Sequence, residues 1–211
     1  MNYTTYLFDF DYTLADSSRG IVTCFRNVLN RHGFSHVTDY NIKRTIGKTL
    51  EDSFSILTGE KDLNICLSYK AEYCKEADIY MTANTFLFPE TIEVLTKLKQ
   101  QGAKIGIIST KYRFRIKDLL DKHIPDTLDI IIGGEDVTEP KPSPQGLLLA
   151  IQRLGVNKES VLYIGDSLVD AETATKAGVD FAAVLHGMTT RDEFIPYPHV
   201  TISSDLRFLI E

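Results

Sequence analysis

The sequence of 211 residues contains few cysteines, no long apolar run and no run of basic residues. Its three cysteines are an odd number without CxxC spacing, so neither a disulfide framework nor a zinc site is expected. No apolar segment approaches the roughly 18 residues of a membrane span, and the N-terminal residues do not resemble a signal peptide. We therefore predict a cytoplasmic protein that does not associate with membranes.

Basic charge is also scarce, because 29 acidic residues outnumber 23 basic ones and give a formal net charge of −6. Proteins that bind nucleic acid usually present a basic face. The densest basic cluster is Lys111, Arg113, Arg115 and Lys117, whose spacing fits no single helical face. We interpret it as the solvated flank of a helix, so the sequence does not favour a nucleic-acid partner.

What the sequence does contain is a series of short apolar runs typical of strands buried on both faces of a parallel sheet. Helical patterns alternate with these runs and end at glycines, which predicts an α/β fold with a parallel sheet. The expected strands are Leu7–Phe10, Ile105–Ser109, Leu128–Ile132, Val161–Ile164 and Phe181–Leu185. The expected helices are Pro89–Gln101, Ser143–Leu154 and Leu168–Ala177, with a final short helix at Asp205–Ile210.

Residues 17–82 lack a convincing buried strand and show helical periods separated by Gly33, Gly47 and Gly59. They predict a helical domain of residues 17–82, inserted after the first strand of a core formed by residues 1–16 and 83–211. Most connections are much shorter than this one. An insert there would lie over the carboxyl edge of the sheet, where open α/β folds bind their ligands.

Asp9 and Asp11 lie where the first apolar run ends. Residues two apart on an extended chain point the same way, so these carboxylates would lie together. Such a pair is costly unless a proton or cation is shared, and hard divalent cations prefer carboxylate oxygens. Helix caps and turns can also contain this pattern, but a turn does not require Asp9 to lie inside an apolar strand.

Asp166 and Asp170 follow another apolar run directly. Asp166 takes the strand-end position that Asp9 takes in the first run, and Asp170 lies four residues on, on the same face of the next helix. The alternative interpretation is that Asp166 or Ser167 merely caps this helix. The pair alone does not decide between a functional and a capping role.

Ser109 and Thr110 follow a third apolar run, where a hydroxyl and backbone N–H groups at a helix start can hold a phosphate. Lys141 lies between two prolines that restrict the backbone, and its charge can neutralise a phosphate. A capped helix and an exposed loop lysine are the alternatives. All these features coincide at the carboxyl ends of predicted strands or in the loops after them, which favours one shared site.

The ordered motifs DFDYTL, IISTK, EPKPSP and GDSLVD resemble those of the haloacid dehalogenase superfamily of phosphotransferases. The helical insert resembles the cap of the branch that includes phosphoglycolate phosphatases and beta-phosphoglucomutases. The resemblance covers nearly the whole chain. It implies a Rossmann-like three-layer core with a parallel sheet and an α-helical cap domain.

The resemblance also implies a role for each motif residue. Asp9 would be the nucleophile, and Asp11 the general acid and base. Mg²⁺ would be held by Asp9, Asp166 and the backbone carbonyl of Asp11, with Asp170 in support. The phosphoryl oxygens would be bound by Ser109, Thr110 and Lys141, and Thr13 would assist Asp11.

The implied activity is Mg²⁺-dependent hydrolysis of a small phosphorylated metabolite such as phosphoglycolate, through an aspartyl-phosphate. A pyrophosphatase, a nucleotidase and a phosphomutase remain alternatives. Mutases of this branch commonly carry a histidine shortly after the first motif, whereas this chain has Gly20 and Ile21 there, which favours hydrolysis. A non-catalytic phospho-receiver module fits badly, because the acid pair opens the chain and a large insert follows it.

Substrate specificity in this family usually depends on the cap. Arg19, Gly47 and Lys48 are the candidates, because the Gly47-Lys48 turn resembles the cap's specificity loop and the charges could meet an anionic group. Their alternative role is that of solvated surface residues. The family pattern assigns no role to His186, and the sequence predicts no oligomeric state.

Overall fold

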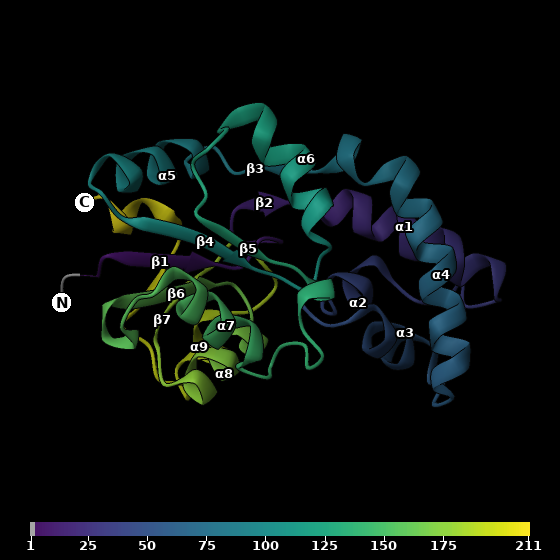
Figure 1. Ribbon diagram of the computed structural model, residues 1–211. Coiled ribbons are helices and arrows are strands. Elements are labelled where there is room, and N and C mark those ends of the chain that lie inside the picture. Colours follow the sequence, from purple (N-terminus) through teal and green to yellow (C-terminus); the bar gives the residue numbers. More distant parts are fainter. Residues whose placement is uncertain (1–2) are drawn as a thin grey trace. The chain divides into compact units, whose positions relative to one another are not determined.

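The computed structural model describes residues 3–211 and divides into two compact units (Figure 1). One unit combines the segment that ends at Ala15 with Leu87–Glu211, and the other is Asp16–Phe86. The boundaries between them fall within β2 (Ala15–Asp16) and β3 (Phe86–Leu87), which pair as a two-stranded sheet. These two short strands have no counterpart among the sequence-based predictions.

The first unit contains a six-stranded parallel sheet in the order β5-β4-β1-β6-β7-β8. The predicted parallel α/β core is confirmed, and five of its strands overlap the five apolar runs. β8 was not predicted, because its three residues are only half-buried and form no apolar run. The strands are β1 (Thr5–Phe8), β4 (Lys104–Ile108), β5 (Ile130–Ile132), β6 (Val161–Gly165), β7 (Asp180–Val184) and β8 (Thr201–Ser203).

Helices cover both faces of this sheet, as Figure 1 shows. Adjacent residues of a strand point to opposite faces, so Phe8 packs in the cluster that includes residues of α5 and α6, and Leu7 in that of α7 and α8. The three-layer core is therefore confirmed. The helices are α5 (Thr91–Gln100), α6 (Arg113–His123), α7 (Gln145–Leu154), α8 (Leu168–Ala177) and α9 (Arg191–Phe194).

The helix ends follow the glycine signals in the sequence. Gly155 and Gly178 have φ values of 63° and 67° and form the C-caps of α7 and α8, a left-handed conformation that favours glycine. The short helix predicted at Asp205–Ile210 is a 3-10 helix over Leu206–Leu209, and the Asp205 carboxylate accepts a hydrogen bond from the N–H of Arg207. α9 was not predicted.

The second unit is helical, as the periodic apolar positions predicted. Its core contains Phe25, whose ring centroid lies 4.7 Å from that of Phe54 and 4.8 Å from that of Tyr73. Ion pairs from Arg31 to Glu72 and Glu76, on another helix, support this packing. The elements are α1 (Ser18–Arg31), α2 (Asp39–Lys43), α3 (Leu50–Thr58), α4 (Leu63–Tyr80) and a 3-10 turn at Thr82–Asn84.

The cysteines are free and lie in this second unit, where Cys24 and Cys66 are buried and Cys74 is half-buried. This agrees with their interpretation as small helix residues without a disulfide. Among residues 3–211, none of the helices is both long enough and apolar enough to cross a membrane.

Candidate active site

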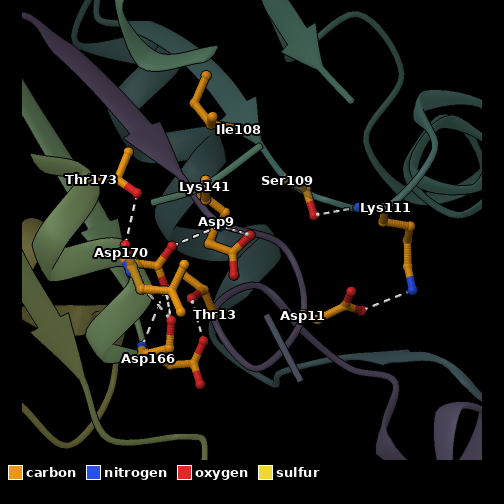
Figure 2. Close-up of polar contacts among 12 residues, drawn as sticks. Asp9, Asp11, Thr13, Ile108, Ser109, Lys111, Lys141, Asp166, Asp170 and Thr173 are labelled. Atoms are coloured by element: carbon orange, nitrogen blue, oxygen red, sulfur yellow. Dashed lines mark hydrogen bonds and ion pairs between the residues drawn. The ribbon is translucent and has the colours of Figure 1, made fainter. Parts of the chain in front are cut away.

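The candidate site lies at the carboxyl edge of the sheet. β1 is flanked by β4 and β6, so the residues that follow these three parallel strands emerge at the same edge. Asp9 follows β1, Ser109 follows β4 and Asp166 follows β6. Figure 2 shows the side chains of the four sequence motifs gathered there.

Asp9 is almost fully buried, with 1% of its surface exposed. Its backbone N–H continues the sheet by donating to the carbonyl of Ile164, which fixes the position of the side chain. One carboxylate oxygen, Oδ1, lies 2.9 Å from Nζ of Lys141. The other oxygen, Oδ2, is buried and has no hydrogen-bond partner among the described residues. Asp9 thus presents one oxygen that is held and one that is available to a ligand.

Three carboxylates form a buried cluster. Asp9, Asp166 and Asp170 each offer an oxygen, and these oxygens lie within 4.8 Å of one another. Burial raises the pKa of Asp9 to about 7, with smaller increases from Asp170 and Asp11 and with Lys141 opposing them. Burial, Asp170 and Asp9 likewise raise the pKa of Asp166 well above its usual value. A divalent cation would relieve this repulsion, and an oxygen donor set suits a hard cation.

Lys141 is the cation that the structure places inside this cluster. Its side chain is 4% exposed, and its Nζ lies 2.9 Å from Asp9 and 2.7 Å from Asp170. Burial lowers the pKa of Lys141, but the charges of Asp170 and Asp9 outweigh that effect and raise it well above its usual value. The interpretation of Lys141 as an exposed loop residue is therefore wrong.

Asp170 is held by donors on several elements. Its Oδ1 accepts hydrogen bonds from Lys141 and from the hydroxyl of Tyr163, and its Oδ2 accepts from the N–H and hydroxyl of Ser167. Ser167 also caps α8, so the capping interpretation is correct for Ser167. Tyr163 belongs to no motif and was not predicted, yet it is buried on β6 and its hydroxyl donates a hydrogen bond to Asp170 at 2.8 Å.

Asp11 points toward a different partner. Its Oδ1 lies 2.9 Å from Nζ of Lys111, and both side chains are at most 10% exposed (Figure 2). Lys111 also lies over the ring of Phe10, with Nζ 5.8 Å from the centroid. The interpretation of Lys111 as part of a solvated helix flank is wrong, because it precedes α6 and turns inward to Asp11. Its position in the IISTK motif was the signal available in the sequence.

The DFDYTL motif forms a tight loop after β1. Tyr12 has φ of 60°, and its N–H donates to the carbonyl of Ala15 at 2.7 Å. The left-handed conformation reverses the chain, so that Thr13, fully buried, directs its hydroxyl to Oδ1 of Asp166 at 3.4 Å. Thr13 therefore lies beside Asp166, whereas the family resemblance implied that it assists Asp11.

Ser109 and Thr110 form the start of the loop after β4. Ser109 is 6% exposed, and its hydroxyl accepts a hydrogen bond from the N–H of Lys111 at 3.2 Å. Gly134 approaches this loop closely, since a Cβ on Gly134 would lie 2.5 Å from the carbonyl oxygen of Thr110. Both predicted phosphate-binding residues therefore lie in a constrained loop at the same sheet edge as Asp9.

The candidate specificity residues belong to the second unit. Arg19 is exposed on α1. Gly47 has φ of 96° in the turn before α3, and Lys48 is half-buried with its N–H donating to the carbonyl of Thr45. A role for these residues in substrate recognition stays a prediction.

Comparison with known proteins agrees with this fold. Residues 6–184 match the family model described as "Haloacid dehalogenase-like hydrolase". The chain therefore belongs to the haloacid dehalogenase-like hydrolase family, as its motifs indicated. A solved structure of a haloacid dehalogenase-like hydrolase from Bacteroides fragilis is 66% identical, covers 99% of this chain and 100% of that one, and superimposes with a TM-score of 0.98.

Two curated relatives carry the names of phosphatases. A phosphoglycolate phosphatase from Aquifex aeolicus is 29% identical over 97% of this chain and 95% of its own length. The pyrophosphatase PpaX from Oceanobacillus iheyensis is 30% identical over 87% of this chain and 84% of its own length. The names of these two relatives denote different phosphorylated substrates, yet both relatives are similar to this chain to nearly the same degree.

Proposed function

We propose that this protein is a Mg²⁺-dependent phosphatase that hydrolyses a small phosphorylated metabolite through an aspartyl-phosphate on Asp9. The observation that carries the proposal is the state of the Asp9 carboxylate. Lys141 holds Oδ1 at 2.9 Å, while Oδ2 is buried and without a partner among residues 3–211. A carboxylate oxygen in that position is suited to nucleophilic attack, because no hydrogen bond has to be broken first.

In the first step, an oxygen of Asp9 forms a bond to phosphorus while the bond from phosphorus to the ester oxygen breaks. The leaving oxygen keeps that electron pair and takes a proton from Asp11. In the second step, Asp11 accepts a proton from water as the water oxygen attacks phosphorus. The bond from phosphorus to the Asp9 oxygen breaks, inorganic phosphate leaves and the Asp9 carboxylate is restored, so Asp11 serves as acid in the first step and as base in the second.

The residues present fit a magnesium ion. Asp9, Asp166 and the backbone carbonyl of Asp11 would hold it, and the buried carboxylate cluster supports this assignment. Asp170 suits a supporting role, because both of its carboxylate oxygens already accept hydrogen bonds. When bound, Mg²⁺ supplies positive charge that reduces the repulsion between the phosphate and the carboxylates.

Lys141, Ser109 and Thr110 would bind the phosphoryl oxygens. Phosphoryl transfer depends mainly on positioning and charge stabilisation, and Lys141 supplies a fixed positive charge beside Asp9. Ser109 and the backbone N–H groups of its loop would add hydrogen-bond donors. The side chains of Asp9 and Asp11 would carry out the bond-making and proton-transfer steps.

Phosphoglycolate and pyrophosphate are the substrates that we place first. A phosphoglycolate phosphatase and a pyrophosphatase are similar to this chain to nearly the same degree, so both substrates are supported. A nucleotidase and a phosphomutase are further alternatives, and Arg19, Gly47 and Lys48 are the proposed specificity residues.

The proposal is tested by phosphate release from a panel that contains phosphoglycolate, pyrophosphate, a sugar phosphate and a nucleotide. We expect release by the wild type with Mg²⁺, and none with a chelator or with Asp9→Asn. Asp118→Asn is the matched control, because Asp118 is exposed on α6. Absence of phosphate release from the whole panel would overturn the proposal, and an isomerised sugar phosphate would indicate a mutase.

A further inference from the structure

His186, in the loop after β7, lies between two oxygen acceptors. Its Nδ1 is 3.2 Å from the carbonyl oxygen of Thr13, and its Nε2 is 3.0 Å from Oε1 of Glu90. A backbone carbonyl only accepts hydrogen bonds, so Nδ1 of His186 donates to Thr13. His186 thus bridges the carbonyl of Thr13 and the carboxyl group of Glu90.

This bridge is shielded from water. The side chains of His186 and Glu90 are 9% and 4% exposed, and the ring of Phe88 packs against His186 with centroids 4.0 Å apart. Glu90 is at the N-cap of α5, where the helix dipole favours negative charge, and its Oε1 lies 3.5 Å from the N–H of Leu206. The pair is therefore a built feature of the core rather than a surface contact.

Thr13 and Gly187 connect His186 to Asp166. Thr13, whose carbonyl accepts the hydrogen bond from His186, directs its own hydroxyl to Oδ1 of Asp166 at 3.4 Å (Figure 2). Gly187, the next residue along the chain, lies so near Asp166 that a Cβ there would be 2.0 Å from Oδ2. Thr13 therefore lies beside Oδ1 of Asp166 and Gly187 beside Oδ2, and His186 contacts the first residue and precedes the second.

We propose that the His186–Glu90 pair positions Asp166 through Thr13 and Gly187, and thereby sets the affinity of the site for a divalent cation. The inference rests on the proposed function, since it takes Asp166 as a ligand of Mg²⁺. His186 is a positioning residue in this account, because it reaches the site only through Thr13 and Gly187. Groups that orient metal ligands commonly change metal affinity by tenfold or more when they are removed.

The test compares His186→Asn with His199→Asn, a matched change at an exposed histidine. Mg²⁺ binding to the whole protein is measured by calorimetry and by the rise in Tm that Mg²⁺ produces. The KM for p-nitrophenyl phosphate is measured at saturating Mg²⁺. For His186→Asn we expect a Kd for Mg²⁺ raised about tenfold, with KM within about twofold of the wild type. His199→Asn should bind Mg²⁺ as the wild type does.

Glu90→Gln keeps an oxygen acceptor for Nε2 of His186, so it should weaken Mg²⁺ binding less than His186→Asn. In Gly187→Ala the added Cβ would displace Oδ2 of Asp166, so this variant should also weaken Mg²⁺ binding. It provides a second measurement if His186→Asn does not fold. An unchanged Kd in folded His186→Asn and Gly187→Ala would overturn the inference. So would equal changes in Kd and KM, which indicate general distortion.

The wild type separates this inference from the proposed function. If it neither binds Mg²⁺ nor releases phosphate from any substrate, the proposed function fails and the inference fails with it. If it does both and the variants match it in Mg²⁺ affinity, only the inference fails.

Discussion

Nζ of Lys141 lies 2.9 Å from Oδ1 of Asp9, and this contact joins the loop that follows β5 to the residue directly after β1. The same ammonium lies 2.7 Å from Asp170, so one lysine offsets part of the charge of the carboxylate cluster. The contact orients Asp9 by one oxygen and leaves the other to a ligand.

Removal of Lys141 should therefore affect both stability and catalysis. In Lys141→Gln the buried carboxylates lose their protein cation, and we expect a lower Tm and phosphatase activity reduced at least about 100-fold. Because Mg²⁺ replaces part of the missing charge, it should raise the Tm of this variant more than that of the wild type. Lys122→Gln, at an exposed position of α6, is the control. An equal rise in Tm with Mg²⁺ for Lys141→Gln and the wild type would contradict this account.

Asp9 should make the metal-free protein less stable as pH rises. Its pKa is raised to about 7 in the folded protein, above the usual aspartate value of 3.8, so the folded state binds the proton more tightly. The free energy of unfolding should then fall between about pH 4 and pH 7, with a limit of about 1.4 kcal/mol per unit of pKa difference. Asp9→Asn should show a smaller decrease, because Asp166, whose pKa is also raised, remains.

The measurement is urea unfolding of the wild type and Asp9→Asn at several pH values, with a chelator present. The stability advantage of Asp9→Asn should grow from pH 4 to pH 7 and shrink when Mg²⁺ is added. A difference that does not depend on pH would show that burial of the Asp9 charge does not limit stability.

The pair of Lys111 and Asp11 predicts a change in kcat. In Lys111→Gln, Asp11 loses the ammonium at 2.9 Å that holds its carboxylate, so proton transfer should be less well positioned. We expect kcat to fall about tenfold or more while KM changes little. Lys117→Gln serves as the control, because the side chain of Lys117 is 54% exposed. A rise in KM with unchanged kcat would instead assign Lys111 to substrate binding.

Tyr163 should contribute to stability through its hydroxyl. Tyr163→Phe keeps the ring in the core but removes the donor to Asp170 at 2.8 Å, and loss of a hydrogen bond to a buried charge costs about 1–3 kcal/mol. Urea unfolding measures the effect, and Tyr40→Phe, at a residue that is 61% exposed, is the matched control. Equal stability of the two variants would mean that the hydroxyl of Tyr163 is dispensable.

The sequence was sufficient to predict residues whose position follows from the sheet. Asp9, Ser109 and Asp166 come directly after buried strands, and the topology of a parallel sheet brings such residues to one edge. The direction and burial of the strands determine where these residues lie, so the apolar runs alone were enough to predict that they come together. The same reasoning explains why the α/β core could be predicted, while the half-buried β8 could not.

Pairs formed by side chains from distant loops could not be predicted. His186 and Glu90 meet because the loop after β7 lies against the start of α5, and neither residue belongs to a pattern that indicates a partner. Lys111 belongs to a motif, yet only the turn of its side chain toward Asp11 separates it from the other basic residues nearby. Such contacts depend on tertiary packing, which local patterns do not encode.

The central claim, that Asp9 carries the phosphoryl group, is tested most directly by trapping the intermediate. The wild type is mixed with a substrate and Mg²⁺, quenched in acid and reduced with borohydride, which converts an aspartyl-phosphate to homoserine. Peptide mass spectrometry then locates the modified residue, with Asp9→Asn as the control. We predict homoserine at position 9 in the wild type, and none there in Asp9→Asn. Substrate turnover without homoserine at position 9, or with homoserine at another aspartate, would contradict the account.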